Sequence, residues 1–231
     1  MGATADMSAV GEARSLIERA ADRSAAEHLD RARAKRLEQA RAIVWAARRL
    51  VTSTGSAFTT QDLVKEAGIA LKTFYRYFAS KDELILAVIE DMVNEAAGAS
   101  AEQGALIDDP LERLYFYTTS VTSGLRSEDD HRAAQFMAIE HWRLLAWYPV
   151  EVIRASQSYT ALLHEAIEAC MEAGVIETSD PLAAAELVTH LVRSIFMHQA
   201  FLGPSERKLI TPDRLWEFCL RGLNVHTGQQ P

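Results

Sequence analysis

The stretch IALKTFYRYFASKDEL, residues 69–84, combines aromatic and basic side chains within a few turns of chain. Phe74 and Phe78 stand four residues apart, a spacing that places both rings on one face of a helix. Lys72 and Arg76 then fall mainly on the other sides. A short helix that is anchored by two phenylalanines and offers positive charge outward indicates contact with a polyanion.

Charge is unevenly distributed along the 231 residues. The net charge of −8 by itself argues against a nucleic-acid partner. Residues 31–82 nevertheless hold 11 basic and 4 acidic side chains, whereas residues 83–231 hold 10 basic and 22 acidic ones. The distribution matters more than the sum, because a phosphate backbone is attracted by a local basic segment. Most of the opening stretch lies in this basic segment.

The composition, 48% hydrophobic and 24% charged, is that of an ordinary globular protein. Apolar runs are far shorter than a membrane span, and the first residues lack the pattern of a signal peptide. Cys170 and Cys219 have neither CxxC nor His spacing, so two buried thiols are favoured over a disulfide. We therefore expect a cytoplasmic protein with no membrane partner.

All periodic segments of the chain are helical, because strand-like alternation and hairpin turns are absent. Residues 13–30 are helix-prone but poor in large apolar groups, so they form either a loose arm or additional turns of helix. The sequence predicts an all-α chain of about nine or ten helices. Expected helical segments include 31–50, 59–67, 71–78, 81–97, 131–146, 150–173, 181–202 and 212–225.

Local signals mark where these helices begin and end. Thr59 with Asp62 and Ser80 with Glu83 have the spacing of capping boxes, and Gly68 is a typical left-handed terminator. Three further starts place a capping oxygen before a proline at the first helical position: Asp109-Pro110, Asp180-Pro181 and Thr211-Pro212.

Residues 59–78 therefore predict a helix, a glycine turn and a second helix. This is the helix-turn-helix motif, whose second helix fits a major groove about 12 Å wide. The helices expected at 31–50 and 81–97 would brace it, since two short helices cannot bury their own apolar faces. An aromatic, basic helix alone is more often a packed surface helix, but here turn, caps, aromatic spacing and charge coincide and favour DNA binding.

The stretch FTTQDLVKEAGIALKTFYRYFASKDELILAVI, residues 58–89, resembles the signature of the TetR family of bacterial transcriptional repressors. The resemblance covers about the first third of the chain, and the remainder carries no diagnostic motif. It implies an N-terminal helix-turn-helix DNA-binding domain at 31–82 and a helical effector-binding and dimerisation domain at 83–226. An arm at 1–30 and a tail at 227–231 flank these two domains.

The resemblance also implies DNA contacts for eight residues. Those of the first helix meet the DNA backbone or a nearby base, those of the second face the major groove, and the last meets a phosphate. The eight are Thr60, Gln61, Leu71, Lys72, Thr73, Tyr75, Tyr77 and Lys81.

Two positions depart from the family pattern. Ala70 stands where a capping Ser is common, and Leu71 stands where a polar contact is common. Leu71 either touches a thymine methyl or packs beside Phe74. Tyr75 has a structural alternative, and Arg76 faces either solvent or a neighbouring acid.

The rest of the chain has no catalytic or metal-binding constellation. Its serines lack a GxSxG context and its histidines lack metal-ligand spacing, so we predict no enzyme, no metal and no cofactor. Residues 115–171 are rich in aromatic and sulfur side chains, which either fill a core or line the apolar effector pocket that the resemblance implies. The candidates are Phe116, Met137, Trp142 and Tyr159, with Gln135 and His141 as polar partners.

The last two helices carry apolar stripes that either pack inward or, as the resemblance implies, pair with a second copy. The candidate interface residues are Leu187, Leu191, Ile195, Leu215, Trp216 and Leu223. A homodimer matches a palindromic operator, because both have two-fold symmetry.

The resulting hypothesis is a homodimeric repressor that binds palindromic double-stranded operator DNA and is released by a small, apolar effector. One alternative is a helix-turn-helix regulator without a small-molecule ligand. The other is a helical-bundle ligand carrier or enzyme whose basic segment is incidental. Salt-dependent binding to duplex DNA separates the last alternative from the other two.

Overall fold

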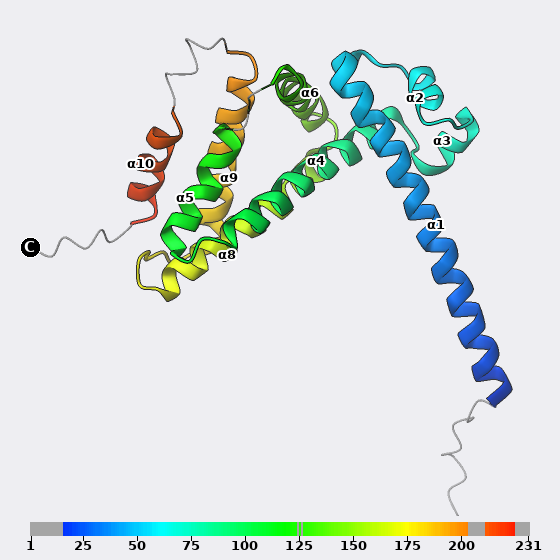
Figure 1. The fold of residues 1–231 in the computed structure, drawn as a ribbon, viewed down its shortest axis with the longest axis horizontal. Helices are drawn as coiled ribbons and strands as arrows, with labels where there is room; N and C mark the ends of the chain where they lie inside the picture. Colours follow the sequence, from blue (N-terminus) through cyan, green and yellow to red (C-terminus); the bar gives the residue numbers. More distant parts are fainter. Residues whose placement is uncertain (1–15, 124, 126, 203–210, 225–231) are drawn as a thin grey trace, which may run out of the picture. The chain divides into compact units, whose positions relative to one another are not determined.

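The computed structural model describes residues 16–123, 125, 127–202 and 211–224 (Figure 1). Within these residues the chain forms ten α-helices and one 3-10 helix and contains no strand, which confirms the all-α prediction. In chain order the elements are α1 (Leu16–Thr54), η1 (Gly55–Ala57), α2 (Thr60–Glu66), α3 (Leu71–Tyr77), α4 (Lys81–Gly104), α5 (Pro110–Ser123), α6 (Glu128–Leu145), α7 (Pro149–Arg154), α8 (Gln157–Glu172), α9 (Pro181–Gln199) and α10 (Pro212–Gly222). No helix among the described residues is both long and apolar enough to cross a membrane.

The chain divides into two units between Ala42 and Ile43. In the first unit, the described residues from Leu16 on are helical. Of the two alternatives for residues 13–30, the additional turns of helix are therefore the correct one from Leu16 on. Alanine-rich sequence favours this, as does the ion pair between Arg31 Nη2 and Glu27 Oε2 at 3.0 Å. The domain boundaries expected at residues 31 and 83 stay predictions, and the tail at 227–231 lies outside the described residues.

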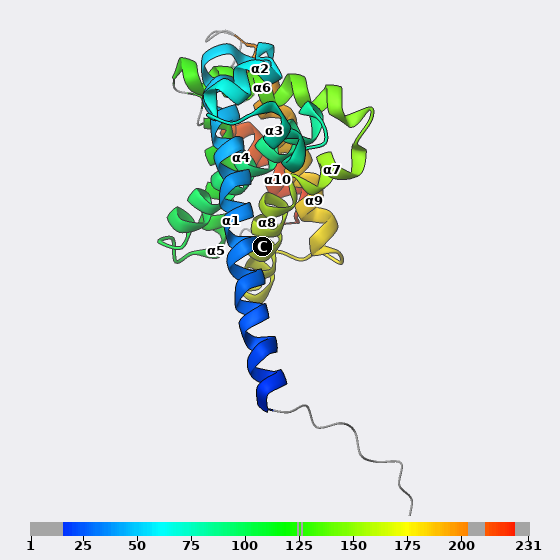
Figure 2. The ribbon, with the colours of Figure 1, turned by 90° about the vertical axis from the view of Figure 1, so that its right-hand side faces the viewer.

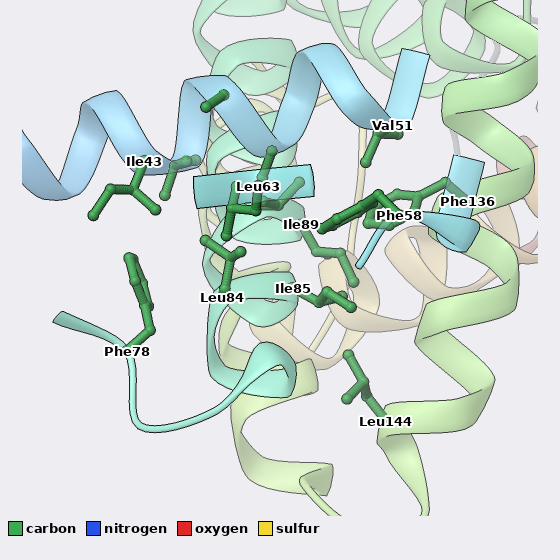
Figure 3. Packing of buried hydrophobic residues seen from close by; sticks show 14 of the residues in the cluster. Ile43, Val51, Phe58, Leu63, Phe78, Leu84, Ile85, Ile89, Phe136 and Leu144 are labelled. Carbon is green, nitrogen blue, oxygen red and sulfur yellow. The ribbon is translucent and has the colours of Figure 1, made fainter. Parts of the chain in front are cut away.

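The first of two hydrophobic clusters in the second unit surrounds α2 and α3. In Figure 3, Ile43 and Val51 lie on the side of α1 that faces Leu84 of α4, and Leu63 of α2 lies between α1 and Leu84. Phe136 of α6 belongs to the same cluster. Helices as short as α2 and α3 are not stable alone, so this shared cluster holds them in place.

The second hydrophobic cluster lies among α4, α5, α8, α9 and α10. Helices α5, α8 and α9 pack against one another, and α10 packs on α5 (Figure 1). Where α4 meets α5, a Cβ added to Gly104 would lie 2.2 Å from Cε1 of Tyr117. Glycine therefore permits this close approach. The main-chain oxygen of Tyr117 accepts a hydrogen bond from the buried hydroxyl of Tyr159.

The helix starts expected from the sequence are formed, with one difference. Thr59 Oγ1 accepts from the N–H of Asp62 at 3.1 Å, and the Asp62 carboxylate accepts from the N–H of Thr59 at 2.8 Å. Ser80 accepts from the N–H of Glu83 at 3.0 Å, but the Glu83 carboxylate bonds to the N–H of Ala79 rather than to that of Ser80. The capping box predicted there is therefore only half formed.

The single helix expected at 150–173 is divided into α7 and α8. Val152 and Ala155 are buried in the first cluster, whereas Tyr159 and Leu163 are buried in the second. The break lets each segment turn its apolar residues toward a different core.

Candidate functional site

Helices α2 and α3 lie next to each other in both views (Figures 1 and 2). The turn between them contains Gly68 at φ +63°, a left-handed conformation that favours glycine. Leu63 and Phe74 are fully buried and Phe78 is nearly so, with the two phenylalanine rings stacked at 6.1 Å between centroids. The inward face predicted for this motif is therefore formed by the expected residues.

The outward face of α3 carries positive charge. Lys72 and Arg76 are exposed, and Tyr75 keeps 53% of its surface. The helix contains no acidic residue, and neither Lys72 nor Arg76 forms an ion pair among the described side chains. A row of exposed basic and hydroxyl groups over two buried rings suits a phosphate backbone.

Aromatic contacts orient the side chains of α3. The Tyr75 ring meets Phe74 edge-on at 5.0 Å, and the Arg76 guanidinium lies 5.3 Å from the centre of the Tyr77 ring. Tyr77 is half-buried against the first cluster, and Leu71 is 45% exposed. Both tyrosines are thus held by the core while part of each remains at the surface.

Lys81 is bound within its own chain. Its ammonium donates to the main-chain oxygens of Phe58 and Ser56, the latter at 3.4 Å, and lies 4.3 Å from the centre of the Phe58 ring. Sequence reasoning gave Lys81 only a DNA contact, because nothing local shows that two carbonyls from the end of η1 lie nearby. The remaining predicted contact residues of α2 and α3 are half-buried (Thr60 and Thr73) or exposed (Gln61).

Other basic groups near this motif are neutralised by carboxylates. Arg48 pairs with Asp91 at 2.8 Å and also with Glu95. Arg49 pairs with Glu66 at 2.6 Å. The motif's exposed lysines and arginine without an ion pair among the described side chains are therefore Lys65 of α2 and Lys72 and Arg76 of α3.

The six candidate effector-pocket residues are distributed over different surroundings. Met137 packs against the first cluster, whereas Phe116 and the buried Tyr159 belong with the second. The Gln135 amide donates to the main-chain oxygen of Ala200 at 2.9 Å. His141 is buried, and Trp142 is 65% exposed. The structure therefore does not gather all six around one cavity.

A depression of about 360 Å³ lies elsewhere, between α5 and α10. None of the six candidates lines it. The residues that line it are Asp109, Leu111, Glu112, Tyr115 and Trp216.

The candidate interface residues also divide into two groups. Leu187 is 66% exposed, and Leu191 and Ile195 are half-buried. Leu215 and Leu223 are each 4% exposed in the second cluster, so these two side chains pack inward in their own chain.

Trp216 is half-buried beside the ring of Tyr115, with 5.5 Å between the ring centres. The outward aromatic residue of α10 is Phe218, 64% exposed, which sequence reasoning missed. Its position three residues beyond Leu215 does not by itself show which side of α10 faces the core.

Arg193 also received no role from the sequence. It is the only lysine or arginine of α9 and follows the apolar pair Leu191-Val192, an unusual place for a charge. The side chain is half-buried. An arginine within an apolar stripe is the signal that could have drawn attention to it.

Part of this sequence is similar to known proteins. Residues 43–88 match the family model described as bacterial regulatory proteins, tetR family. The uncharacterised HTH-type transcriptional regulator YvaF of Bacillus subtilis (strain 168) is 40% identical over 47 residues, which make up 20% of this chain and 25% of YvaF. The chain thus spans about a quarter of the length of that relative.

RolR and a FadR protein are among the solved structures that share most of this fold. RolR, in complex with the ligand resorcinol, is 18% identical with a TM-score of 0.63, over 84% of this chain and 92% of RolR. FadR of Thermus thermophilus, a TetR family transcriptional repressor in complex with lauroyl-CoA, is 18% identical with a TM-score of 0.62, over 83% of this chain and 98% of FadR. At such identities the likeness concerns the fold.

Proposed function

We propose that this chain, whose residues 43–88 match the model of the tetR family of bacterial regulatory proteins, is a DNA-binding homodimeric repressor of palindromic operators that is released by a small effector. The observation that carries the proposal is the surface of α3. Lys72 and Arg76 are exposed and unpaired by carboxylates above the buried Phe74 and Phe78. An operator lies in the cytoplasm of a bacterium, so the protein would act there.

Within this proposal, the eight predicted residues make different contacts with the DNA. Lys72 and Tyr75 are exposed and contact the major groove and its phosphates. Thr60 and Gln61 bind the DNA backbone or a nearby base at the start of α2, and Thr73 faces the major groove beside Lys72. Leu71 offers an apolar contact.

Lys81 and Tyr77 have a double role in this proposal. An ammonium has three donors, and the contacts of Lys81 with two carbonyls leave one N–H for a phosphate. The half-buried Tyr77 presents its hydroxyl to the DNA while its ring packs on the core.

A second copy of the chain would cover the outer faces of α9 and α10. Leu187 and Phe218 are 66% and 64% exposed, an unfavourable state for large apolar side chains in an isolated monomer. Leu191, Ile195 and Trp216 add partly exposed apolar surface. Two-fold pairing of these helices would present two copies of α3 to the two halves of a palindrome.

A small-molecule effector would act by shifting the protein between conformers. The similar folds of RolR and FadR hold resorcinol and lauroyl-CoA, respectively. Such a ligand must bind the DNA-incompetent conformer more tightly than the other, since equal affinities would change nothing.

The proposal is tested by selecting a binding site from random duplex DNA and measuring affinity by fluorescence anisotropy at several salt concentrations. Log affinity should fall linearly with log salt, because each neutralised phosphate releases counterion. Lys72→Ala should reduce that slope by about one contact. The same change at Arg154, an exposed residue of α7, is the matched control. Absence of salt-dependent duplex binding would exclude the proposed function.

A further inference from the structure

Arg193 of α9 lies where three elements meet. One of its terminal nitrogens, Nη1, donates to Oγ of Ser156, between α7 and α8, at 3.4 Å. The other, Nη2, contacts Nδ1 of His190. A guanidinium only donates, so Nδ1 of His190 is the acceptor in this contact. These two contacts use few of the five N–H groups of Arg193.

The charge of Arg193 has no counter-charge among the described residues. Burial lowers the pKa of Arg193, the direction expected where no carboxylate offsets it. Two half-buried arginines of the same unit, Arg48 and Arg132, form ion pairs with carboxylates, whereas Arg113 donates to main-chain oxygens instead. A half-buried guanidinium without an anion is costly, which indicates that a ligand supplies one.

His141 of α6 provides a second, independent sign of a ligand. It is 7% exposed, and the contact recorded for its ring is with Trp142, with no hydrogen bond to either ring nitrogen among the described residues. Burial, with the nearby charges of Arg193 and His190, lowers the pKa of His141 to about 4. The neutral ring therefore has an N–H that is free to donate.

Apolar surface lies beside this polar group. The ring of Trp142 meets His141 edge-on at 5.4 Å and is 65% exposed. Ile139 stands three residues before Trp142, on the same face of α6, and is 48% exposed. A ligand with an anionic end and an apolar body would match both surfaces.

From this arrangement we propose that Arg193, His141 and Ser156 bind the carboxylate of a small organic acid. A guanidinium fork fits two carboxylate oxygens, while the imidazole N–H and the hydroxyl can donate to the same group. Trp142 and Ile139 contact the apolar body. The inference rests on the proposed function, since this acid would be its effector, and it makes that effector amphipathic rather than wholly apolar.

Matched pairs of probes test this site in the full-length protein. Benzoate is compared with benzyl alcohol, and dodecanoate with dodecanol, by isothermal titration calorimetry. Both carboxylates should bind the wild type more tightly than the alcohols do. Arg193→Met should weaken carboxylate binding about ten-fold or more, as expected for losing a charge-assisted hydrogen bond, and leave the alcohols unchanged. Arg154→Met is the control and should bind like the wild type.

Four outcomes would overturn the proposal. The first is equal affinity of the wild type for the acids and the alcohols, and the second is unchanged carboxylate binding by Arg193→Met. The third is that sulfate, at matched ionic strength, competes for the site as well as a carboxylate does. The fourth is loss of the dimer in Arg193→Met. The last would place the missing carboxylate in a second copy. DNA binding is measured separately. Release of DNA by an alcohol alone would reject the acid site but keep the regulator, whereas carboxylate binding without any effect on DNA would reject the effector role alone.

Discussion

Helices α3 and α10 are both short and amphipathic, but they bury their aromatic residues to different degrees. In α3 the ring of Phe74 is fully buried, and the outer face is basic and polar. In α10 Leu215 and Cys219 are buried, yet Phe218 keeps 64% of its surface. The outer surface of α3 is polar and basic, which suits contact with water or with an anionic partner. Helix α10 instead exposes apolar surface, which another apolar surface would cover.

A second contrast lies within the helix-turn-helix motif itself. Lys72 is exposed and unpaired, while Lys81 donates to main-chain oxygens at the end of η1. Two lysines nine positions apart in one motif thus have different surroundings. Lys72 contributes to the exposed basic surface of α3, whereas Lys81 contributes to the stability of the fold.

The largest expected effect separates Phe74 from Phe218. Phe74→Ala should lower the free energy of unfolding by roughly 3–5 kcal/mol, because it leaves a cavity in the first cluster. Phe218→Ala should change the stability of the monomer by less than about 0.5 kcal/mol, since the ring is mostly in water. Urea unfolding at low protein concentration measures both.

Sedimentation of the same two variants sharpens the contrast. Phe218→Ala should weaken self-association, while Phe74→Ala should not do so at temperatures where it remains folded. If Phe218→Ala unfolds as readily as Phe74→Ala in the monomer, the two helices do not differ in the way described.

The next effect compares the two lysines. Lys81→Ala should cost roughly 2 kcal/mol in stability, because it removes charged hydrogen bonds to two carbonyls. Lys72→Ala should leave the melting temperature unchanged and weaken operator binding alone. Calorimetry and anisotropy on each variant distinguish these outcomes. Equal melting temperatures for both variants would contradict the internal role of Lys81.

Acid should destabilise the region around His141. Its folded-state pKa is lowered to about 4 by burial and by the charges of Arg193 and His190, below the value near 6.5 of an unfolded histidine. Between these values the unfolded chain binds the extra proton, so stability falls as pH decreases through that window. The loss attributable to His141 at pH 5 should be about 1–2 kcal/mol.

His141→Gln should remove this part of the pH dependence, whereas the same change at the exposed His198 should not. Chemical unfolding of the wild type and the two variants at pH 7 and at pH 5 measures these differences. A wild type and a His141→Gln variant with the same difference between the two pH values would show that His141 is not the group responsible.

The smallest expected effect concerns Tyr77. Tyr77→Phe removes a hydroxyl and almost no volume, so the melting temperature should not move. Operator affinity should fall by about 1 kcal/mol for one lost hydrogen bond. If the variant melts early and binds normally, then Tyr77 belongs wholly to the core, and the outward face of α3 would need to be redrawn.

Local interactions made the helix-turn-helix motif predictable from sequence. The Thr59–Asp62 capping box, the left-handed Gly68 and the burial of Phe74 all follow from residues within a few positions of one another. The all-α class followed from periodicity in the same way. These signals hold because helix caps and turn geometry require no distant partner.

The tertiary structure alone decided which face of a longer apolar stripe is buried. Leu215 of α10 and Leu223 at its C-cap pack inward while Phe218 lies outside, and the sequence offers both faces as apolar. The break between α7 and α8 likewise depends on two cores that meet there. Burial is a property of neighbouring helices, which the pattern along one helix does not contain.

The charged residues show most clearly which properties follow from the sequence and which follow only from the tertiary structure. The sequence determined that residues 31–82 are basic and that α3 has no acid. Only the folded chain shows that Lys81 bonds to carbonyls more than twenty positions away and that Arg193 lies near the buried His141. Electrostatic interactions depend on distance in space and on exclusion of water, and both arise only when helices that are remote in the chain pack together.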